Sequence, residues 1–193
     1  MIKLWTFQTA EAYEKLENQG YLIGRRELIE PLFVKAYNWL NQQMMKRIGE
    51  PPHEGQYPMW AWHRCDEIDN LERGGHLVPG TRGVRIEFEI DAKSVLLSDF
   101  DSWHYVLNHW YLPASESDGD AFELELKQQG LYSLYFKKSL PHNFNQRIEA
   151  SWDRIFNLTD YSTQATFWKL ESDQVLDVKW FTAEDERIDC DDD

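Results

Sequence analysis

The chain has 193 residues, of which 42% are hydrophobic and 28% are charged, and its formal net charge is −14. This composition excludes a disordered chain, and the length suffices for one domain that buries about 70% of its unfolded surface. Residues 184–193 carry seven acidic residues and one arginine, so they contribute −6 and the other residues −8. We predict a globular domain over residues 1–183, then an acidic tail, and no affinity for duplex DNA.

The sequence lacks the features of secreted and membrane proteins. No apolar stretch approaches the ~20 residues of a membrane-spanning helix, and the N-terminus lacks the apolar core of a signal peptide. Only Cys65 and Cys190 are present, the second of them in the acidic tail, so no structural disulfide is expected. We therefore expect a cytoplasmic protein without a membrane partner.

The first fifty residues predict one strand and two helices. Residues 2–7 form the expected strand. Thr9 is a suitable N-cap for a helix that ends at Gly20, because glycine readily adopts the left-handed conformation of a helix C-terminus. The second helix has Pro31 in its first turn, carries apolar residues on one face and ends at Gly49.

The middle of the chain predicts two further strands and the start of a helix. Residues 58–64 (PMWAWHR) predict one strand. Residues 84–90 alternate apolar and polar side chains, as in a strand with one solvated face. The polar stretch 64–82 between them is expected to be a long loop. Ser98 is the expected N-cap of the next helix, which has acidic residues in its first turn.

The last third of the chain predicts helices followed by a hairpin. Residues 113–120 are expected to be a loop, residues 120–129 a short helix, and Asn143 the start of a strongly amphipathic helix. Residues 165–171 and 175–181 predict two strands joined by a Ser-Asp turn. Because strands and helices mix without βαβ regularity, we predict an α+β fold with a mostly antiparallel sheet and about five helices.

The sequence gives little indication of a metal site or of a catalytic nucleophile. The spacings of zinc sites are missing around His63 and Cys65, and no metal is expected. His104 and His109 lie about 140° apart around a helix, so isolated polar or capping histidines explain them better. Cys65 next to His63 leaves a Cys–His nucleophile open as an alternative, but no orienting partner is evident. The common phosphate-binding motifs are absent.

Aromatic and basic residues provide the better candidates for binding. Trp60 and Trp62 stand at alternate positions of one strand, near Tyr57, so the two indoles share a face on which a flat heterocycle could stack. The alternative is that both indoles are core residues. Arg25 and Arg26 could clamp a diphosphate or a carboxylate. Arg82 and Arg85 could do the same, and surface ion pairs with Glu27, Glu30, Glu87 and Glu89 are the alternative.

Four sequence blocks resemble a bacterial family known as domain of unknown function family 3841. The blocks are KLWTFQT, YPMWAW, VLLSDFDSWHYVLN and QATFWKL, and they are spread over nearly the whole chain. This resemblance implies no chemistry.

A weaker resemblance, to the ADP-ribosyltransferase and RNA 2′-phosphotransferase group of folds, does imply chemistry. The order of a first strand, a helix ending in glycine, an aromatic strand and a late hairpin opening on glutamine is similar to that group. In the group, a split and strongly bent sheet clasps NAD. The resemblance places Trp5 and Thr6 on the first motif, where the group has His or Arg, so Arg25 or Arg26 would have to bind the phosphates.

The same resemblance implies that Tyr57, Trp60 or Trp62 contacts nicotinamide and ribose, and that Gln164 takes the catalytic position. The stronger catalysts carry Glu there, because a carboxylate stabilises the positive charge that develops on the ribose; one preorganised group contributes ~3–4 kcal/mol. A Gln site would be slow, would depend on another carboxylate such as Glu171, or would only bind. The alternative for Gln164 is a strand-edge amide in a hydrogen-bonded hairpin.

Two hypotheses follow. The first is an ADP-ribosyltransferase-like domain that binds NAD or a related nucleotide, with ADP-ribose transfer to a macromolecular acceptor as its further activity. It predicts a cavity in which Trp60 or Trp62, Gln164 and an arginine converge. The second is a non-enzymatic acidic interaction protein, regulatory or antitoxin-like, whose tail and exposed aromatic residues engage a basic partner.

Overall fold

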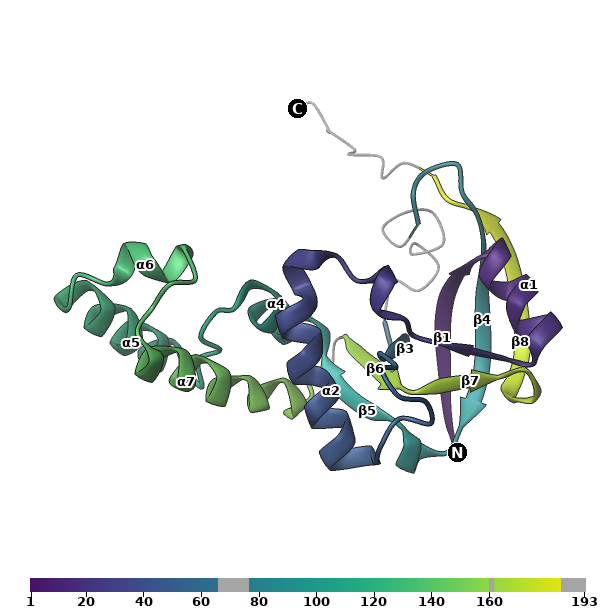
Figure 1. Cartoon of the computed structure of the whole chain (residues 1–193), viewed down its shortest axis with the longest axis horizontal. Coiled ribbons are helices and arrows are strands. Elements are labelled where there is room, and N and C mark those ends of the chain that lie inside the picture. The colour runs from purple at the N-terminus through teal and green to yellow at the C-terminus, as the bar shows by residue number, and fades with distance from the viewer. Residues whose placement is uncertain (66–76, 160–161, 185–193) are drawn as a thin grey trace.

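A computed structural model describes residues 1–65, 77–159 and 162–184 (Figure 1). The chain is an α+β protein with a mostly antiparallel sheet. In chain order, the strands and α-helices are β1 (Ile2–Thr9), α1 (Ala10–Gln19), β2 (Tyr21–Ile23), α2 (Val34–Ile48), β3 (Met59–Arg64), β4 (Arg82–Ile90), β5 (Leu96–Asp99), α4 (Phe100–Asn108), α5 (Glu116–Gln128), α6 (Tyr132–Phe136), α7 (His142–Ser151), β6 (Thr163–Phe167), β7 (Lys169–Glu171) and β8 (Val175–Thr182).

Most local predictions are confirmed. The Thr9 hydroxyl caps α1 by accepting from the Ala12 amide, and Gly20 ends the helix in the left-handed conformation. The amphipathic helix predicted from Asn143 is α7, which continues as a short 3-10 helix over Trp152–Phe156. Several predictions need correction. Helix α5 starts earlier than expected, at the N-cap Ser115, and Pro31 lies in a short 3-10 helix before α2 and not in the first turn of α2. The short elements β2, β5 and α6 were not predicted.

Two sheets are present among the described residues. The larger one has six strands in the order β5-β6-β3-β1-β4-β8, and its paired neighbours are antiparallel. β2 and β7 form a separate two-stranded sheet. Figure 1 shows α1 next to β4 and β8, whereas α5, α6 and α7 are grouped at the opposite end of the molecule.

The predicted hairpin between residues 165–171 and 175–181 is wrong. β6 lies inside the large sheet between β3 and β5, whereas β8 pairs with β4 at the other edge. The strand predicted over 165–171 is interrupted at Trp168, whose buried indole donates to the Gly49 carbonyl over 2.9 Å. The interruption lets β7 leave the large sheet and pair with β2, so long-range burial overrides the local turn signal.

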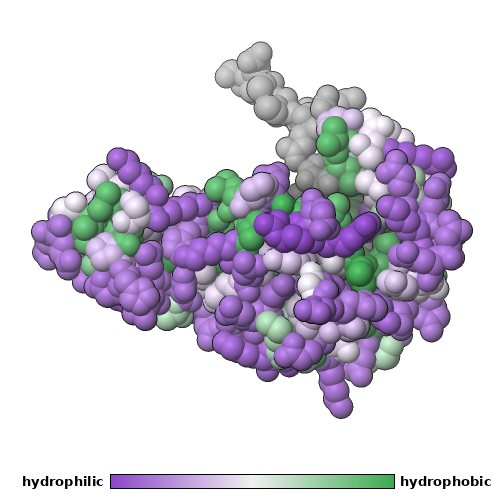
Figure 2. Space-filling view, viewed as in Figure 1, coloured by the Kyte–Doolittle hydropathy of each residue, from purple (hydrophilic) through white to green (hydrophobic). Residues whose placement is uncertain are grey.

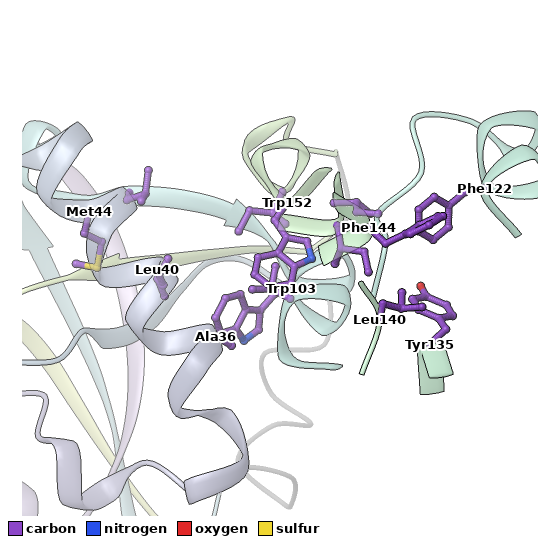
Figure 3. Close-up of a cluster of buried hydrophobic side chains, with 14 of the residues drawn as sticks. Ala36, Leu40, Met44, Trp103, Phe122, Tyr135, Leu140, Phe144 and Trp152 are labelled. Atoms are coloured by element: carbon purple, nitrogen blue, oxygen red, sulfur yellow. The ribbon is translucent and has the colours of Figure 1, made fainter. Parts of the chain in front are cut away.

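Two clusters of buried side chains form the interior. The first, the sheet core, packs one face of the large sheet against α1 and the small sheet through residues such as Leu4, Leu16, Phe88, Phe167 and Leu170. The second, the helical core, joins α2, α4 and β5 to α5–α7. In Figure 3, Trp103 and Trp152 lie near the centre of the helical core. The α2 residues lie on one side of them, and residues of α5, α6, α7 and the segment between α6 and α7 lie on the other; the labelled residues are Ala36, Leu40, Met44, Phe122, Tyr135, Leu140 and Phe144.

The joint between β1 and β3 divides the large sheet. β1 pairs with β4 along its whole length, from Ile2 to Thr9, but it pairs with β3 only at Trp5 and Trp62. Side chains replace the backbone ladder beyond this rung. The Thr6 hydroxyl donates to the Trp60 carbonyl over 2.8 Å, and on the other side Nδ1 of His63 lies 3.4 Å from the Lys3 carbonyl oxygen. We call this joint the Trp5–Trp62 rung.

The helix α4 begins one residue later than predicted. Ser98 is a buried residue of β5, and the N-cap is Asp99, whose carboxylate accepts from the Ser102 amide over 2.8 Å. The Thr159 hydroxyl donates to the other carboxylate oxygen over 2.5 Å. Burial alone would raise the pKa of Asp99, but these hydrogen bonds favour the ionised form more strongly, so its pKa is lowered.

This cap gives a pH-dependent prediction. The substitution Asp99→Asn keeps the cap geometry and removes the charge, so we expect a loss of about 1 kcal/mol in the free energy of unfolding at pH 7. The pKa of Asp99 in the folded protein lies below the unfolded value of about 3.9. The full difference in stability between the variant and the wild-type protein should therefore be present above pH 5, and it should disappear as the pH falls through the folded pKa. Urea unfolding across this range measures it, with the exposed Asp101→Asn as control; a difference independent of pH contradicts the prediction.

The face of the molecule shown in Figure 2 is mostly hydrophilic. On the face shown in Figure 2, hydrophobic residues form separate groups among hydrophilic ones, a distribution that is ordinary for a protein surface. Among the helices that the structure describes, none is both long enough and apolar enough to cross a membrane.

Candidate functional site

A cavity of about 400 Å³ opens between the large sheet and helices α2 and α4. Its size falls in the ~300–1,000 Å³ range of small-molecule sites. We call it the main cavity. The described residues that line it include seven aromatic rings, which are Trp5, Phe7, Tyr37, Trp60, Trp62, Phe100 and Trp103. Its polar side chains are Thr6, Gln8, Arg25, His104 and Gln164.

One row of paired residues across the sheet builds the floor of the main cavity. Trp5 is opposite Trp62, and Trp62 is opposite Gln164. The row continues on one side to Glu87 on β4 and on the other to Ser98 on β5. Directly opposite residues of antiparallel strands project from the same face. The sheet therefore presents two neighbouring indoles and a side-chain amide on a single surface.

The two tryptophans of β3 serve both roles considered for them. Trp60 and Trp62 line the main cavity, and they also pack against α4. The Trp62 ring lies 4.9 Å from that of Phe100, and the Trp60 ring lies 5.1 Å from that of Trp103. Trp62 is buried, whereas Trp60 is half-buried. The helix packing fixes both rings in place, so the cavity has a preorganised aromatic wall.

Gln164 lies inside the sheet and not at its edge. The expectation of a strand-edge amide in a hairpin is therefore wrong, because β6 has neighbours on both sides. The side chain is 5% exposed, and its Nε2 has no hydrogen-bond partner among the described residues. The Oγ of Ser98, on the paired position of β5, is likewise buried without a partner there. Such groups are rare, since each costs about 1–3 kcal/mol when buried.

The residues that the resemblance placed on the first strand both line the main cavity. The Trp5 indole N–H donates to Glu87 over 2.8 Å, and Lys3 forms an ion pair with the same carboxylate at 2.7 Å. Hydrogen bonds from Lys3 and then Trp5 lower the pKa of Glu87. The Thr6 hydroxyl donates to the Trp60 carbonyl and accepts from Gln8. The Thr6 hydroxyl is thus used in structural hydrogen bonds, whereas the Trp5 ring remains available to contact a ligand.

The predicted phosphate-binding arginines differ in position. Arg25 lines the main cavity from an exposed position, whereas Arg26 is exposed and is not part of the described lining. Tyr57 also lies outside that lining, and its hydroxyl donates to the Asn38 side chain over 2.6 Å. The backbone holds Arg25 at the cavity because Gly24 pairs with Tyr57 in an isolated bridge.

His104 and Tyr37 belong to the cavity and were not predicted as site residues. Nδ1 of His104 lies 3.1 Å from the Phe100 carbonyl oxygen, so in the neutral ring Nδ1 carries the proton and Nε2 can accept a hydrogen bond. Burial raises the pKa of the Tyr37 hydroxyl, and the nearby Trp60 indole opposes this shift. The Trp60 N–H does not reach hydrogen-bond geometry with any described acceptor. The i, i+4 spacing of Phe100 and His104 in the predicted helix was the available signal.

The described lining of the main cavity contains no carboxylate, although the chain is strongly acidic. Arg25 and His104 are its only groups of basic character in the described part of the chain. Glu171, considered as an auxiliary carboxylate, lies on β7 and pairs with Lys169 at 2.5 Å, away from this lining. The site therefore favours a neutral or anionic ligand with flat rings.

Other predicted features lie elsewhere. His63 and Cys65 are not part of the described lining of the main cavity, and no group of three or more His, Cys, Asp or Glu among the described residues could hold a metal ion. Residues 66–76 of the predicted long loop lie outside the described residues, as does the acidic tail beyond Glu184. The interaction hypothesis, which depends on that tail, stays a prediction from the sequence.

Comparison with known proteins gives one family. A family model described as Domain of unknown function (DUF3841) matches residues 3–176, which is most of the chain. No curated protein matches the chain. No solved structure matches it either.

Proposed function

The chain belongs to the DUF3841 family, and from the geometry of the main cavity we propose that it is an ADP-ribosyltransferase-like domain that binds NAD or a related nucleotide. The observation that carries the proposal is the convergence of Trp60, Arg25 and Gln164 on one cavity from three separate parts of the chain. The single-rung joint between β1 and β3 adds support, since the fold group clasps NAD with a split sheet.

Each part of a nucleotide has a matching group in the main cavity. A nicotinamide or adenine ring stacks on the preorganised indoles, an arrangement that contributes apolar burial together with ring geometry. The Arg25 guanidinium can bind a diphosphate with two parallel hydrogen bonds. The unpartnered Nε2 of Gln164 donates to a ribose hydroxyl or to the carboxamide oxygen of nicotinamide, which satisfies an otherwise buried donor.

The same residues favour binding over rapid transfer. Cleavage of the nicotinamide–ribose bond builds positive charge on the ribose, and a nearby carboxylate stabilises that charge. The described lining of the main cavity offers the neutral Gln164 instead. Transfer of ADP-ribose to a macromolecular acceptor is thus the further chemistry of the proposed site, and we expect it to be slow compared with enzymes that have a carboxylate at this position.

Binding can be tested by thermal unfolding with NAD. If the Kd is about 10 μM, 1 mM NAD stabilises the folded protein by about 2.7 kcal/mol, which raises the Tm by roughly 5–10 °C. Arg25→Gln should weaken binding about tenfold, since hydrogen bonds to charged groups contribute about 1.5 kcal/mol or more. Arg26→Gln is the matched control, because it makes the same charge change at an exposed position outside the described lining.

Gln164→Leu gives a second, independent measurement. It should weaken NAD binding, yet the free variant should be as stable as the wild-type protein or more stable, because a buried N–H donor without a partner is removed at similar volume. Nicotinamide release, followed by chromatography, separates binding from transfer. The absence of any NAD-dependent shift in Tm contradicts the proposal, as does an equal loss in Arg25→Gln and Arg26→Gln.

A further inference from the structure

A second, smaller cavity lies at the C-terminal end of α4. It has a volume of about 190 Å³, and Leu107 lines both cavities. Four polar side chains from different elements line it. Lys35 comes from the first turn of α2, His109 from the C-cap of α4, Lys138 from the segment after α6, and Asn145 from α7. We call it the basic cavity.

The backbone places two basic residues at the basic cavity in an unfavourable conformation. His109 has φ 57° and Lys138 has φ 53°, and within the described chain these are the only non-glycine residues with positive φ. Glycine or asparagine would adopt this conformation more easily. Both residues line the same cavity, so the strained positions coincide with basic side chains, a pattern that is typical of functional sites.

Hydrogen bonds fix the orientation of His109. The Asn145 Nδ2 donates to the Leu140 carbonyl, so its Oδ1 faces the ring, and Nε2 of His109 donates to that oxygen over 3.1 Å. Nδ1 of His109 is buried without a partner among the described residues. Burial is the main cause that lowers the pKa of His109, and the positive charges of Lys35 and Lys138 lower it further, against the opposing effects of Asn145 and Glu149. The imidazole is therefore neutral, and the two ammonium groups supply the charge.

The ammonium of Lys35 lies near the basic cavity and remains able to bind a ligand there. It pairs with Glu149 at 2.8 Å. It also lies 3.5 Å from Nε2 of His109, which donates to Asn145 and therefore accepts no hydrogen bond from the ammonium. The side chains of this pair are 63% and 41% exposed, so water screens their attraction and an incoming anion can share the ammonium. The carboxylate of Glu149 would repel such an anion. Lys138 supplies the second positive charge of the cavity.

We propose that the basic cavity binds a small oxyanion of the phosphate type, held between the ammonium groups of Lys35 and Lys138. The volume suits a free phosphate or the terminal phosphate of a monoester, and charge-assisted hydrogen bonds from lysine suit both. The inference does not depend on the nucleotide proposal, because the two cavities have different polar residues.

The test is calorimetric titration of the full chain with inorganic phosphate and, in a second arm, with methyl phosphate, at constant ionic strength set with sodium chloride. Tighter binding of phosphate identifies the free anion, and tighter binding of methyl phosphate identifies a monoester. A site with a Kd of about 1 mM would also raise the Tm by roughly 3–5 °C at 10 mM ligand.

Variants separate the site from a general salt effect. Lys138→Gly removes an ammonium and relieves the positive φ, so the free variant should melt at the same temperature as the wild-type protein or higher, while its phosphate affinity falls at least tenfold. Lys137→Gly is the control, because the neighbouring lysine has negative φ and lies outside the described lining. No heat of binding for either ligand in the wild-type protein, or an equal loss in both variants, overturns the proposal.

Discussion

Replacement of Gly24 by alanine is expected to destabilise the protein by about 2–3 kcal/mol and to lower the affinity of the main cavity for NAD, the ligand proposed above. A Cβ at this position would lie 2.3 Å from the Tyr57 carbonyl oxygen and 2.4 Å from that of Pro58. Both neighbours are backbone atoms, so no side-chain rotation can relieve the overlap. The segment has to move, and the adjacent Arg25 moves with it.

Urea unfolding and NAD titration of Gly24→Ala measure these two effects. Gly119→Ala is the control. Gly119 lies inside helix α5, and a Cβ at this position would meet only Pro113, at 3.4 Å. Alanine is the better helix former, so this control should be neutral or stabilising by up to about 1 kcal/mol. Equal effects of the two substitutions on stability would show that the bridge between Gly24 and Tyr57 does not constrain the chain.

Trp152→Ala is the substitution with the largest expected effect, a loss of about 3–5 kcal/mol in the free energy of unfolding. Trp152 is 1% exposed and lies near the centre of the helical core (Figure 3). Its ring lies 5.5 Å from that of Trp39 and 5.1 Å from that of His109. Its N–H donates to the Trp110 carbonyl over 2.8 Å. The substitution therefore leaves a large void and an unpaired carbonyl.

Two further variants test whether packing explains the loss. Trp152→Phe keeps a ring in the helical core and should lose roughly half as much as Trp152→Ala, since it forms a smaller void. Trp180→Ala, at a position that is 43% exposed on β8, should lose about 1 kcal/mol or less. If the exposed and buried tryptophans gave similar losses in urea unfolding, the central place of Trp152 in the core would be wrong.

Local structure was predictable where neighbouring residues determine it. Thr9 and Gly20 mark the ends of α1 because a hydroxyl acceptor and a left-handed glycine satisfy free backbone groups within one turn. The apolar period of the helix from Asn143 likewise predicts the buried face that Phe144 and Ile148 form. Such signals act over three or four residues, and tertiary contacts did not alter them.

Strand pairing could not be predicted in the same way. Ser172 and Asp173 do lie in a turn, but that turn separates β7 and β8, which pair with different partners. The alternation of a strand specifies which side chains share a face, and it does not specify which strand lies opposite. The alignment of Trp5, Trp62 and Gln164 in one row depends on this register.

The cavity residues that prediction missed show the same limit. His104 and Tyr37 reach the main cavity from α4 and α2, two helices that cross the same face of the sheet. Helical periodicity indicates that these residues have a face, but the packing of two helices over a sheet determines what the face meets. Arg25 and Arg26 differ in the same way, because a short 3-10 helix begins at Arg26 and turns the chain directly after the residue that lines the cavity.

The Trp5–Trp62 rung has a consequence for the cooperativity of unfolding. The backbone ladder of β1, β4 and β8 meets that of β3, β5 and β6 at a single residue pair. The two halves of the sheet are held together mainly by the shared sheet core, so the amide hydrogens of each half can exchange in separate opening events. A molecule seated on this rung would contact both halves at once. Binding of such a molecule would then join two separately opening units into one. Protection against amide hydrogen exchange would rise even on strands that the molecule does not contact.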